Sequence, residues 1–145
     1  MRVNKNNLIN IDTRNIYVVP STSFLIGHQN CRSCRNKVSE IRDLIYEQNI
    51  DLMFLTETWL KKDDDKLMEP IKPPGYYFRS FPRIDRGGGG IALLMKTAYL
   101  PQVESVNELS FASFQAISII LKLANRKVSL ACVYKPPKSK KYTFT

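Results

Sequence analysis

From residue 24 onward, short apolar runs alternate with turn-forming residues, a pattern that predicts several strands and one helix. The segments 24–30 and 51–56 each contain a continuous apolar run, which is typical of strands covered on both faces. Between them, apolar residues recur at helical spacing: Val38, Ile41, Leu44 and Ile45. We therefore predict a strand–helix–strand unit, with Ser33 or Asn36 capping a helix that ends by Asn49.

The rest of the chain has fewer helical patterns and more strand-like ones. Four further strands are expected, at residues 76–81, 91–95, 114–123 and 128–134. The last two are separated by only a few residues, so they are expected to form a hairpin. Acidic residues 63–65 predict a surface turn, and prolines and glycines predict loops over 70–75 and 82–90. The pattern as a whole is mixed α/β, with more strand than helix.

Both ends of the chain differ from this body. Residues 1–23 are polar and rich in asparagine, and we expect a loosely ordered lead-in. Residues 138–145 continue a basic segment that begins at Lys135 and are expected to form a basic tail. The folded domain is therefore expected over residues 24–137.

Composition narrows the class of protein. The chain has 145 residues, 43% of them apolar, which is typical of one globular domain. The formal net charge of +9 favours a polyanionic partner such as nucleic acid. No apolar run approaches the roughly 20 residues that span a bilayer, and no secretion signal is visible, so we expect no membrane partner. Three cysteines, an odd number, fit a reducing intracellular compartment better than a disulfide framework.

Two polar residues stand where the first two predicted strands end. Asn30 follows one apolar run and Glu57 follows the other. Strands joined by a single helix are expected to lie parallel, so that their carboxyl ends open on one edge, where α/β proteins bind ligands. A carboxylate at that edge is suited to Mg²⁺, which binds one or two carboxylates together with water and phosphate. The alternative is that Glu57 only caps or pairs with a following loop.

A glycine run, 87–90, follows Arg86 and suggests a phosphate-binding loop. The P-loop pattern fails, because no Lys-Ser or Lys-Thr follows and the next element is a predicted strand. A turn that leads into this strand is the favoured interpretation. Arg79, Arg83 and Arg86 either contact nucleic-acid phosphates or form a solvated basic loop.

Cys31 and Cys34 form an isolated Cys-x-x-Cys pair, with only His28 and Cys132 as further candidate ligands for zinc. Structural zinc or redox chemistry is therefore disfavoured. His28 is the only histidine and is expected at the end of a core strand, where a hydrogen-bonded structural role is favoured.

A set of short motifs occurs in an order that resembles a known family. The motifs are Asn30-Cys31-Arg32-Ser33, Asn36-Lys37, Leu55-Thr56-Glu57-Thr58-Trp59-Leu60, Pro74-Gly75-Tyr76, Arg86-Gly87-Gly88-Gly89-Gly90-Ile91-Ala92-Leu93-Leu94, Ser113-Phe114-Gln115 and Val133-Tyr134-Lys135-Pro136-Pro137. Over about residues 24–137 the chain resembles the endonuclease domain of LINE-type (non-LTR) retrotransposons. That domain belongs to the endonuclease/exonuclease/phosphatase superfamily, as do apurinic/apyrimidinic endonucleases and deoxyribonuclease I.

The resemblance implies a four-layer α/β sandwich, in which two sheets pack face to face with helices outside. It also implies Mg²⁺-dependent (or Mn²⁺-dependent) nicking of DNA, with nuclear action. Glu57 matches the metal-binding glutamate and Asn30 the active-site asparagine, which is also placed at the metal. Tyr134 matches the active-site tyrosine near the scissile phosphate. In this scheme the metal stabilises negative charge that develops on the phosphate.

The chain also departs from the family pattern. It lacks the Gly-Asp-Phe-Asn-like and Ser-Asp-His-like motifs that follow Tyr134 in the family, and Gln115 stands where a glutamate is usual. We therefore expect about the first half of the fold, inactive as a nuclease alone, with self-association through an uncovered sheet face. The alternatives are a nucleic-acid-binding remnant that does not cut and a retrotransposon relic without function.

Overall fold

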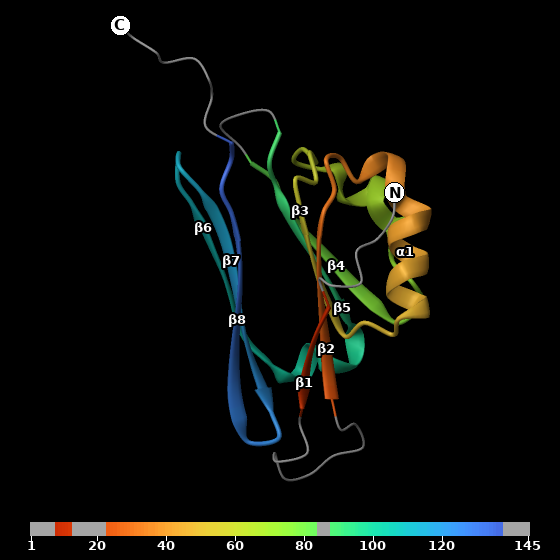
Figure 1. Cartoon of the computed structure of the whole chain (residues 1–145), viewed down its shortest axis with the longest axis vertical. Helices are drawn as coiled ribbons and strands as arrows, with labels where there is room; N and C mark the ends of the chain where they lie inside the picture. Colours follow the sequence, from red (N-terminus) through yellow and green to blue (C-terminus); the bar gives the residue numbers. More distant parts are fainter. Residues whose placement is uncertain (1–7, 13–22, 84–87, 138–145) are drawn as a thin grey trace, which may run out of the picture.

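The computed structural model describes residues 8–12, 23–83 and 88–137, arranged in three layers (Figure 1). The central layer is a five-stranded sheet in the order β1-β2-β3-β5-β4. Its strands are β1 (Leu8–Asp12), β2 (Ser23–Asn30), β3 (Leu52–Thr56), β4 (Tyr76–Phe81) and β5 (Ile91–Lys96). A three-stranded antiparallel sheet, in the order β6-β7-β8, packs on one face. It contains β6 (Val103–Ser110), β7 (Gln115–Leu123) and β8 (Arg126–Tyr134).

The predicted strand–helix–strand unit is confirmed. β2 and β3 pair in parallel, with Asn30 opposite Thr56, and α1 (Val38–Glu47) connects them. The helix buries Ile41, Leu44 and Ile45 against the central sheet. Its predicted start was wrong in detail, because a short 3-10 turn, η2 (Arg35–Lys37), precedes α1 and no side chain caps either element. Backbone hydrogen bonds of the preceding loop to β3 position the helix start instead.

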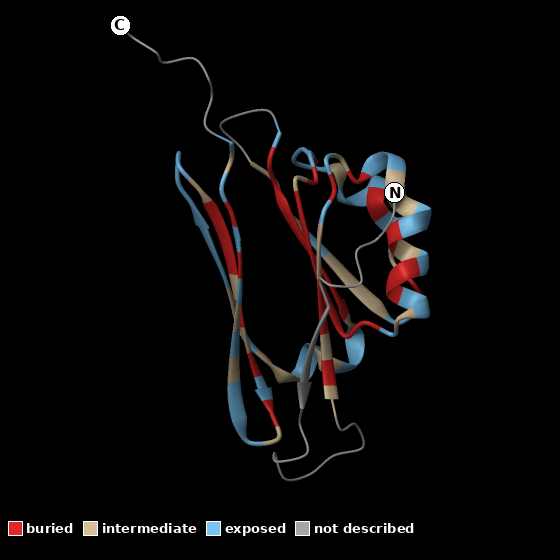
Figure 2. Cartoon of the chain, viewed as in Figure 1, coloured by how far each residue is buried: buried red, intermediate tan, exposed pale blue. Residues whose placement is uncertain are grey.

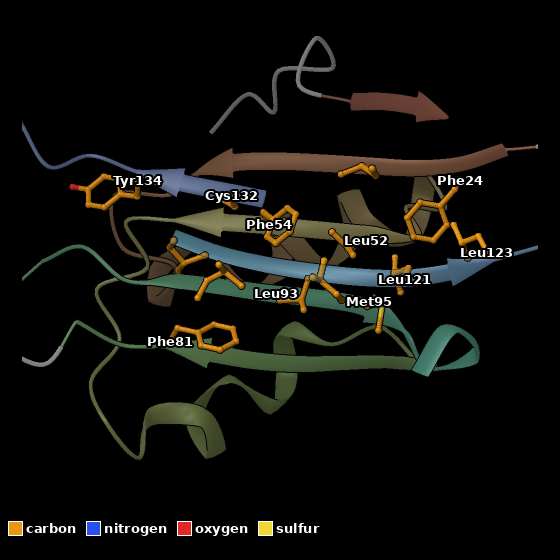
Figure 3. Packing of buried hydrophobic residues seen from close by; sticks show 14 residues of the cluster. Phe24, Leu52, Phe54, Phe81, Leu93, Met95, Leu121, Leu123, Cys132 and Tyr134 are labelled. Carbon is orange, nitrogen blue, oxygen red and sulfur yellow. The ribbon is translucent and has the colours of Figure 1, made fainter. Parts of the chain in front are cut away.

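One hydrophobic cluster fills the space between the two sheets (Figure 3). Alternate residues of β2 and β3 face alternate residues of β7 and β8, as the two-residue period of a strand requires. Its members include Phe24, Ile26, Leu52, Phe54, Leu93, Ile117, Ile119, Leu121 and Tyr134. Tyr134 lies at one end of the cluster, with Phe24 and Leu123 at the other.

A second cluster lies on the opposite face of the central sheet. There Met53, Leu55 and Leu94 pack against α1 and against η3 (Asp64–Ile71), a 3-10 helix. β3 is thus buried on both faces, as its continuous apolar run predicted. Figure 2 shows that β3 and β5, in the middle of the central sheet, are buried along most of their length.

The predictions for β4, β5 and the β7–β8 hairpin are confirmed. Two strands were missed. β1 lies inside the lead-in that we expected to be loosely ordered, where it pairs antiparallel with β2, so that prediction was wrong for residues 8–12. β6 was missed because its exposed, polar sequence has no apolar run, and pairing with β7 decides its conformation. Residues 64–71 form η3 where a turn and a loop were expected.

The outer face of the three-stranded sheet carries no helix among the described residues. Its central row contains the small or polar residues Asn107, Ser118 and Ala131. The neighbouring row carries Leu109 and Val133, which are exposed by 53% and 63%. This face is less apolar than the uncovered face that we expected.

Within the described residues, no helix is long and apolar enough to cross a membrane. The basic tail, residues 138–145, lies outside the described residues.

Candidate active site

Glu57 and Tyr134 meet at one end of the sandwich. Glu57 follows the last residue of β3, and Tyr134 is the last residue of β8 in the other sheet. The Tyr134 hydroxyl donates a hydrogen bond of 3.1 Å to Glu57 Oε1, although the residues are 77 positions apart in the sequence. The two sheets therefore bring together two of the three residues predicted to be catalytic.

The backbone around Glu57 is held from two sides. On one side, Cys31 N donates to Thr56 O and Ser33 N donates to Glu57 O, both at 2.8 Å. On the other side, Thr58 N donates to Gly90 O at 3.3 Å and Trp59 N donates to Gly89 O at 2.9 Å. Glu57 has a φ of +52°, a left-handed conformation that a non-glycine residue keeps only when its surroundings enforce it. These four hydrogen bonds supply that constraint.

Two glycines of the run combine a left-handed backbone conformation with close neighbouring side chains. At Gly90, whose φ is +89°, a Cβ atom would lie 2.6 Å from Thr58 Oγ1. At Gly89, whose φ is +66°, a Cβ atom would lie 2.9 Å from Arg83 Cδ and 3.5 Å from Tyr134 Cε1. The run leads into β5 as expected, and it also supports the loop that carries Glu57.

The Tyr134 hydroxyl keeps its proton at neutral pH. Burial raises the pKa of Tyr134, and the negative charge and hydrogen bond of Glu57 raise it further, whereas Arg83 acts in the opposite direction. The phenol is therefore a neutral hydrogen-bond donor at this site. Glu57 itself is half-buried.

Asn30 lies beside this pair. It is the last residue of β2, exposed, and paired with Thr56, the residue before Glu57. By strand alternation it shares a face with Phe24 and Ile26, which point toward the second sheet. Asn30, Glu57 and Tyr134 thus occupy one end of the space between the sheets.

The predicted phosphate-contacting arginines are placed differently from one another. Arg83 is at the site: it approaches Gly89, acts on the pKa of Tyr134, and donates a 3.4 Å hydrogen bond to Ala112 O. Arg79 lies further back along β4, with its guanidinium 4.7 Å from the centroid of the Phe81 ring. Arg86 lies outside the described residues.

The cysteine pair and the histidine have structural surroundings. Cys31 and Cys34 are buried free thiols, and burial is the main factor that raises their pKa values to about 12 and about 11. Cys34 Sγ packs 3.7 Å from Met68 Sδ. His28 Nε2 lies 3.1 Å from Thr56 Oγ1, and burial lowers the pKa of the imidazole. Within the described residues, no three His, Cys, Asp or Glu side chains cluster as a metal site.

Sequence reasoning missed three features of this end. Thr58 is fully buried and anchors the loop, Trp59 is 47% exposed, and Phe111 in the β6–β7 loop is 52% exposed. Gln115 is 2% exposed and donates a 2.8 Å hydrogen bond to Phe81 O, while its Oε1 atom has no partner among the described residues. An apolar residue two positions after Glu57 was the one sequence signal for Trp59.

A profile of the endonuclease/exonuclease/phosphatase family matches residues 27–129, which is well over half of the chain. The chain belongs to this family. The fold agrees, because the chain is similar to the AP endonuclease LMAP from Leishmania major, with a TM-score of 0.60 and 16% identity over 77% of this chain and 40% of that one.

Two further solved structures have the same fold. Truncated TDP2 from Caenorhabditis elegans gives a TM-score of 0.52 and 17% identity, over 74% of this chain and 42% of that one. The APE2 catalytic domain from Xenopus laevis gives 0.51 and 16%, over 77% and 44%. A search of curated proteins found no match. The chain therefore has a mixed α/β fold similar to that of AP endonucleases and spans less than half the length of these structures.

Proposed function

We propose that this chain is the amino-terminal part of a LINE-type retrotransposon endonuclease, whose site binds a divalent cation and a DNA phosphodiester. The Glu57–Tyr134 hydrogen bond is the observation that carries the proposal. It places a carboxylate and a neutral donor together at the open end of two packed sheets, beside Arg83. The family match, the similarity to an AP endonuclease and the net charge of +9 favour nucleic acid as the polyanion. The action then takes place inside the cell, at nuclear DNA.

The residues fit Mg²⁺ or Mn²⁺ in kind, although they are few. Glu57 and Asn30 offer hard oxygen atoms at adjacent strand ends, which is the chemistry that these ions prefer. Among the described residues, Tyr134 is the one side-chain hydrogen-bond partner of Glu57, and it occupies Oε1. When bound, the ion would act as a Lewis acid on a phosphoryl oxygen. Water must supply most of its ligands, so we expect weak binding.

The chain's own residues would orient the phosphodiester rather than activate water. The protonated Tyr134 hydroxyl can donate to a phosphate oxygen if it gives up its hydrogen bond to Glu57 Oε1, and Arg83 can offset the phosphate charge. Within the described residues, no three His, Cys, Asp or Glu side chains form a cluster that includes Glu57, and His28 Nε2 lies against Thr56 Oγ1. A positioned general base typically contributes about 10²- to 10⁴-fold to a rate. We therefore propose that the chain does not nick DNA by itself.

A second candidate function is nucleic-acid binding without cleavage. Two observations favour it. The chain has a strong positive charge, and no three His, Cys, Asp or Glu side chains cluster as a metal site within the described residues. Binding of this kind should weaken steeply with salt, because each neutralised phosphate releases counterions.

Three measurements on the chain test these proposals together. Mn²⁺ titration, monitored by water proton relaxation, should show binding that Glu57→Gln abolishes. Glu47→Gln, which alters an exposed residue of α1, should leave this binding unchanged. Supercoiled plasmid with Mg²⁺ should remain intact, while DNA binding at low salt is retained.

The outcomes separate the candidates. Glu57-dependent nicking would overturn the proposed inactivity and confirm the nuclease. Equal Mn²⁺ binding by chain and variant would remove the metal site. Absence of DNA binding at low salt would leave only the relic.

Self-association is part of the same proposal. Leu109 and Val133, exposed on the outer face of the β6–β8 sheet, offer apolar contacts to a second copy on that face. Sedimentation velocity should show a dimer that Val133→Lys dissociates, and a monomer at all concentrations would contradict this.

A further inference from the structure

Trp59 is an exposed aromatic side chain at the candidate active site. It is the only tryptophan of the chain, and it remains 47% exposed although most large apolar residues nearby are buried. It lies two residues after Glu57, and the residue between them, Thr58, is fully buried. Glu57 and Trp59 therefore flank one buried residue, Thr58, which fixes the backbone between them.

Contacts with the glycine run fix the position of Trp59. Its φ is +56°, a left-handed conformation, and its N–H donates to Gly89 O at 2.9 Å. The polar edge of the indole lies against Gly88, where a Cβ atom would approach Nε1 to 3.7 Å. Gly88 has a φ of +78°, so the glycine run both holds the tryptophan backbone and leaves room for its ring.

The surroundings of Trp59 favour a polyanion with flat, apolar groups. Lys61 and Lys62 lie two and three residues after Trp59, ahead of the acidic residues 63–65 in the same segment. Arg83 approaches Gly89, to which the Trp59 backbone is hydrogen-bonded. Indole faces stack on nucleobases with little preference for sequence, because every base has a π-face. Cationic side chains beside such a ring hold the phosphates that connect the bases.

We infer that Trp59 stacks on an unpaired nucleobase, next to the phosphodiester that binds at the site formed by Glu57 and Tyr134. This rests on the proposed function, and it specifies the substrate as nucleic acid with an accessible base at the site. The glycine run then has a second role: it positions the stacking ring as well as the loop of Glu57.

Intrinsic fluorescence tests the inference directly, because Trp59 is the only tryptophan. The probes are a single-stranded oligothymidylate and an abasic oligodeoxynucleotide of equal length and charge, added to the unaltered chain at low salt. Labelled forms of both report binding by anisotropy. Stacking predicts that the oligothymidylate quenches Trp59 strongly, whereas the abasic oligomer binds with little quenching.

Variants give a second readout. Base–aromatic stacking energies correspond to an affinity loss of about 5- to 150-fold for Trp59→Ala on the oligothymidylate. Trp59→Ala should lose little affinity for the abasic oligomer. The affinity of Trp59→Phe for the oligothymidylate should lie between those of the unaltered chain and Trp59→Ala. Tyr46→Ala removes a ring that is 69% exposed on α1 and serves as the matched control, with no expected effect.

Each outcome of these experiments either supports or overturns the stacking inference. Base-dependent quenching with selective loss in Trp59→Ala supports stacking. If both oligomers bind and quench equally, or if Trp59→Ala binds oligothymidylate normally, the stacking inference is overturned while nucleic-acid binding stands. If neither oligomer binds, the proposed function fails and this inference fails with it. The quenching arm needs no variant, so a misfolded Trp59→Ala would not prevent the test.

Discussion

β3 has a carboxylate at each end, and the protein satisfies the two to very different degrees. Asp51 precedes the strand and is 7% exposed. Its Oδ2 accepts a 2.8 Å hydrogen bond from Leu25 N, and its Oδ1 lies 2.9 Å from Lys96 Nζ. Its backbone N–H and carbonyl also bond to Leu25 and Lys96. Asp51 therefore joins three strands of the central sheet.

Glu57 follows the same strand and has less support. It is half-buried, and among the described residues its side chain accepts one hydrogen bond, from the neutral hydroxyl of Tyr134. The constraints at Glu57 act mainly on the backbone, whereas Asp51 is held equally through its backbone and through both carboxylate oxygens. A carboxylate paired with a cation and a backbone donor thus stabilises the fold, whereas a carboxylate with fewer partners retains capacity for a ligand.

The largest expected effect is at Asp51. Asp51→Asn removes the negative charge that pairs with Lys96 and should lower the free energy of unfolding by about 3 kcal/mol. Urea denaturation measures this change. Glu104→Gln, which breaks the exposed pair with Lys127, is the control and should cost less than about 1 kcal/mol. Equal effects of the two substitutions would contradict the structural role of Asp51.

The two ends of the sheet also differ in how much space surrounds a glycine. Gly90→Ala at the site end combines a φ of +89° with a 2.6 Å clash against Thr58 Oγ1. Gly75→Ala at the Asp51 end has a φ of +80° but no atom within 4 Å of the new Cβ. We expect about 1 kcal/mol of destabilisation for Gly75→Ala and up to about 3 kcal/mol for Gly90→Ala. Adding Thr58→Ala should recover part of the Gly90 loss, and similar thermal midpoints for the two single variants would show that the clash relaxes freely.

A smaller effect is expected at the Glu57–Tyr134 hydrogen bond. Tyr134→Phe should lower the free energy of unfolding by about 1 kcal/mol. Glu57→Gln should lower the pKa of Tyr134, because the glutamate charge and hydrogen bond help to raise it. Alkaline titration of tyrosinate absorbance, with Tyr134→Phe subtracted to isolate this residue among the seven tyrosines, measures the shift. An unchanged titration in Glu57→Gln would show that burial alone sets the Tyr134 pKa.

The smallest effect concerns His28, beside Thr56 at the same end. Burial lowers its pKa below 6.5, so the unfolded chain binds the proton more readily than the folded chain. The stabilisation is present above pH 6.5 and is lost as the pH falls through the folded-state pKa. Urea midpoints measured from neutral to mildly acidic pH should fall more for the chain than for His28→Gln. A parallel decline in both would assign the acid sensitivity to the carboxylates.

Local pattern predicted those parts of the fold that local chemistry controls. The β2–α1–β3 unit was predicted because continuous apolar runs flank a segment of helical period. The same unit correctly placed Asn30 beside the end of β3 and Glu57 at the same edge. β6 escaped prediction, because a polar edge strand is decided by its hydrogen-bonding partner β7 rather than by its own residues.

The amino-acid sequence by itself determined the family, the order of the main strands and the choice of Glu57 as a candidate ligand. The tertiary structure was needed to show that Tyr134 reaches Glu57 across 77 positions, that Gly89 and Gly90 hold the loop of Glu57, and that Trp59 is exposed. The physical reason is range. Periodicity and turn chemistry act over a few residues, whereas these contacts arise when two sheets bury a shared core and bring their strand ends together.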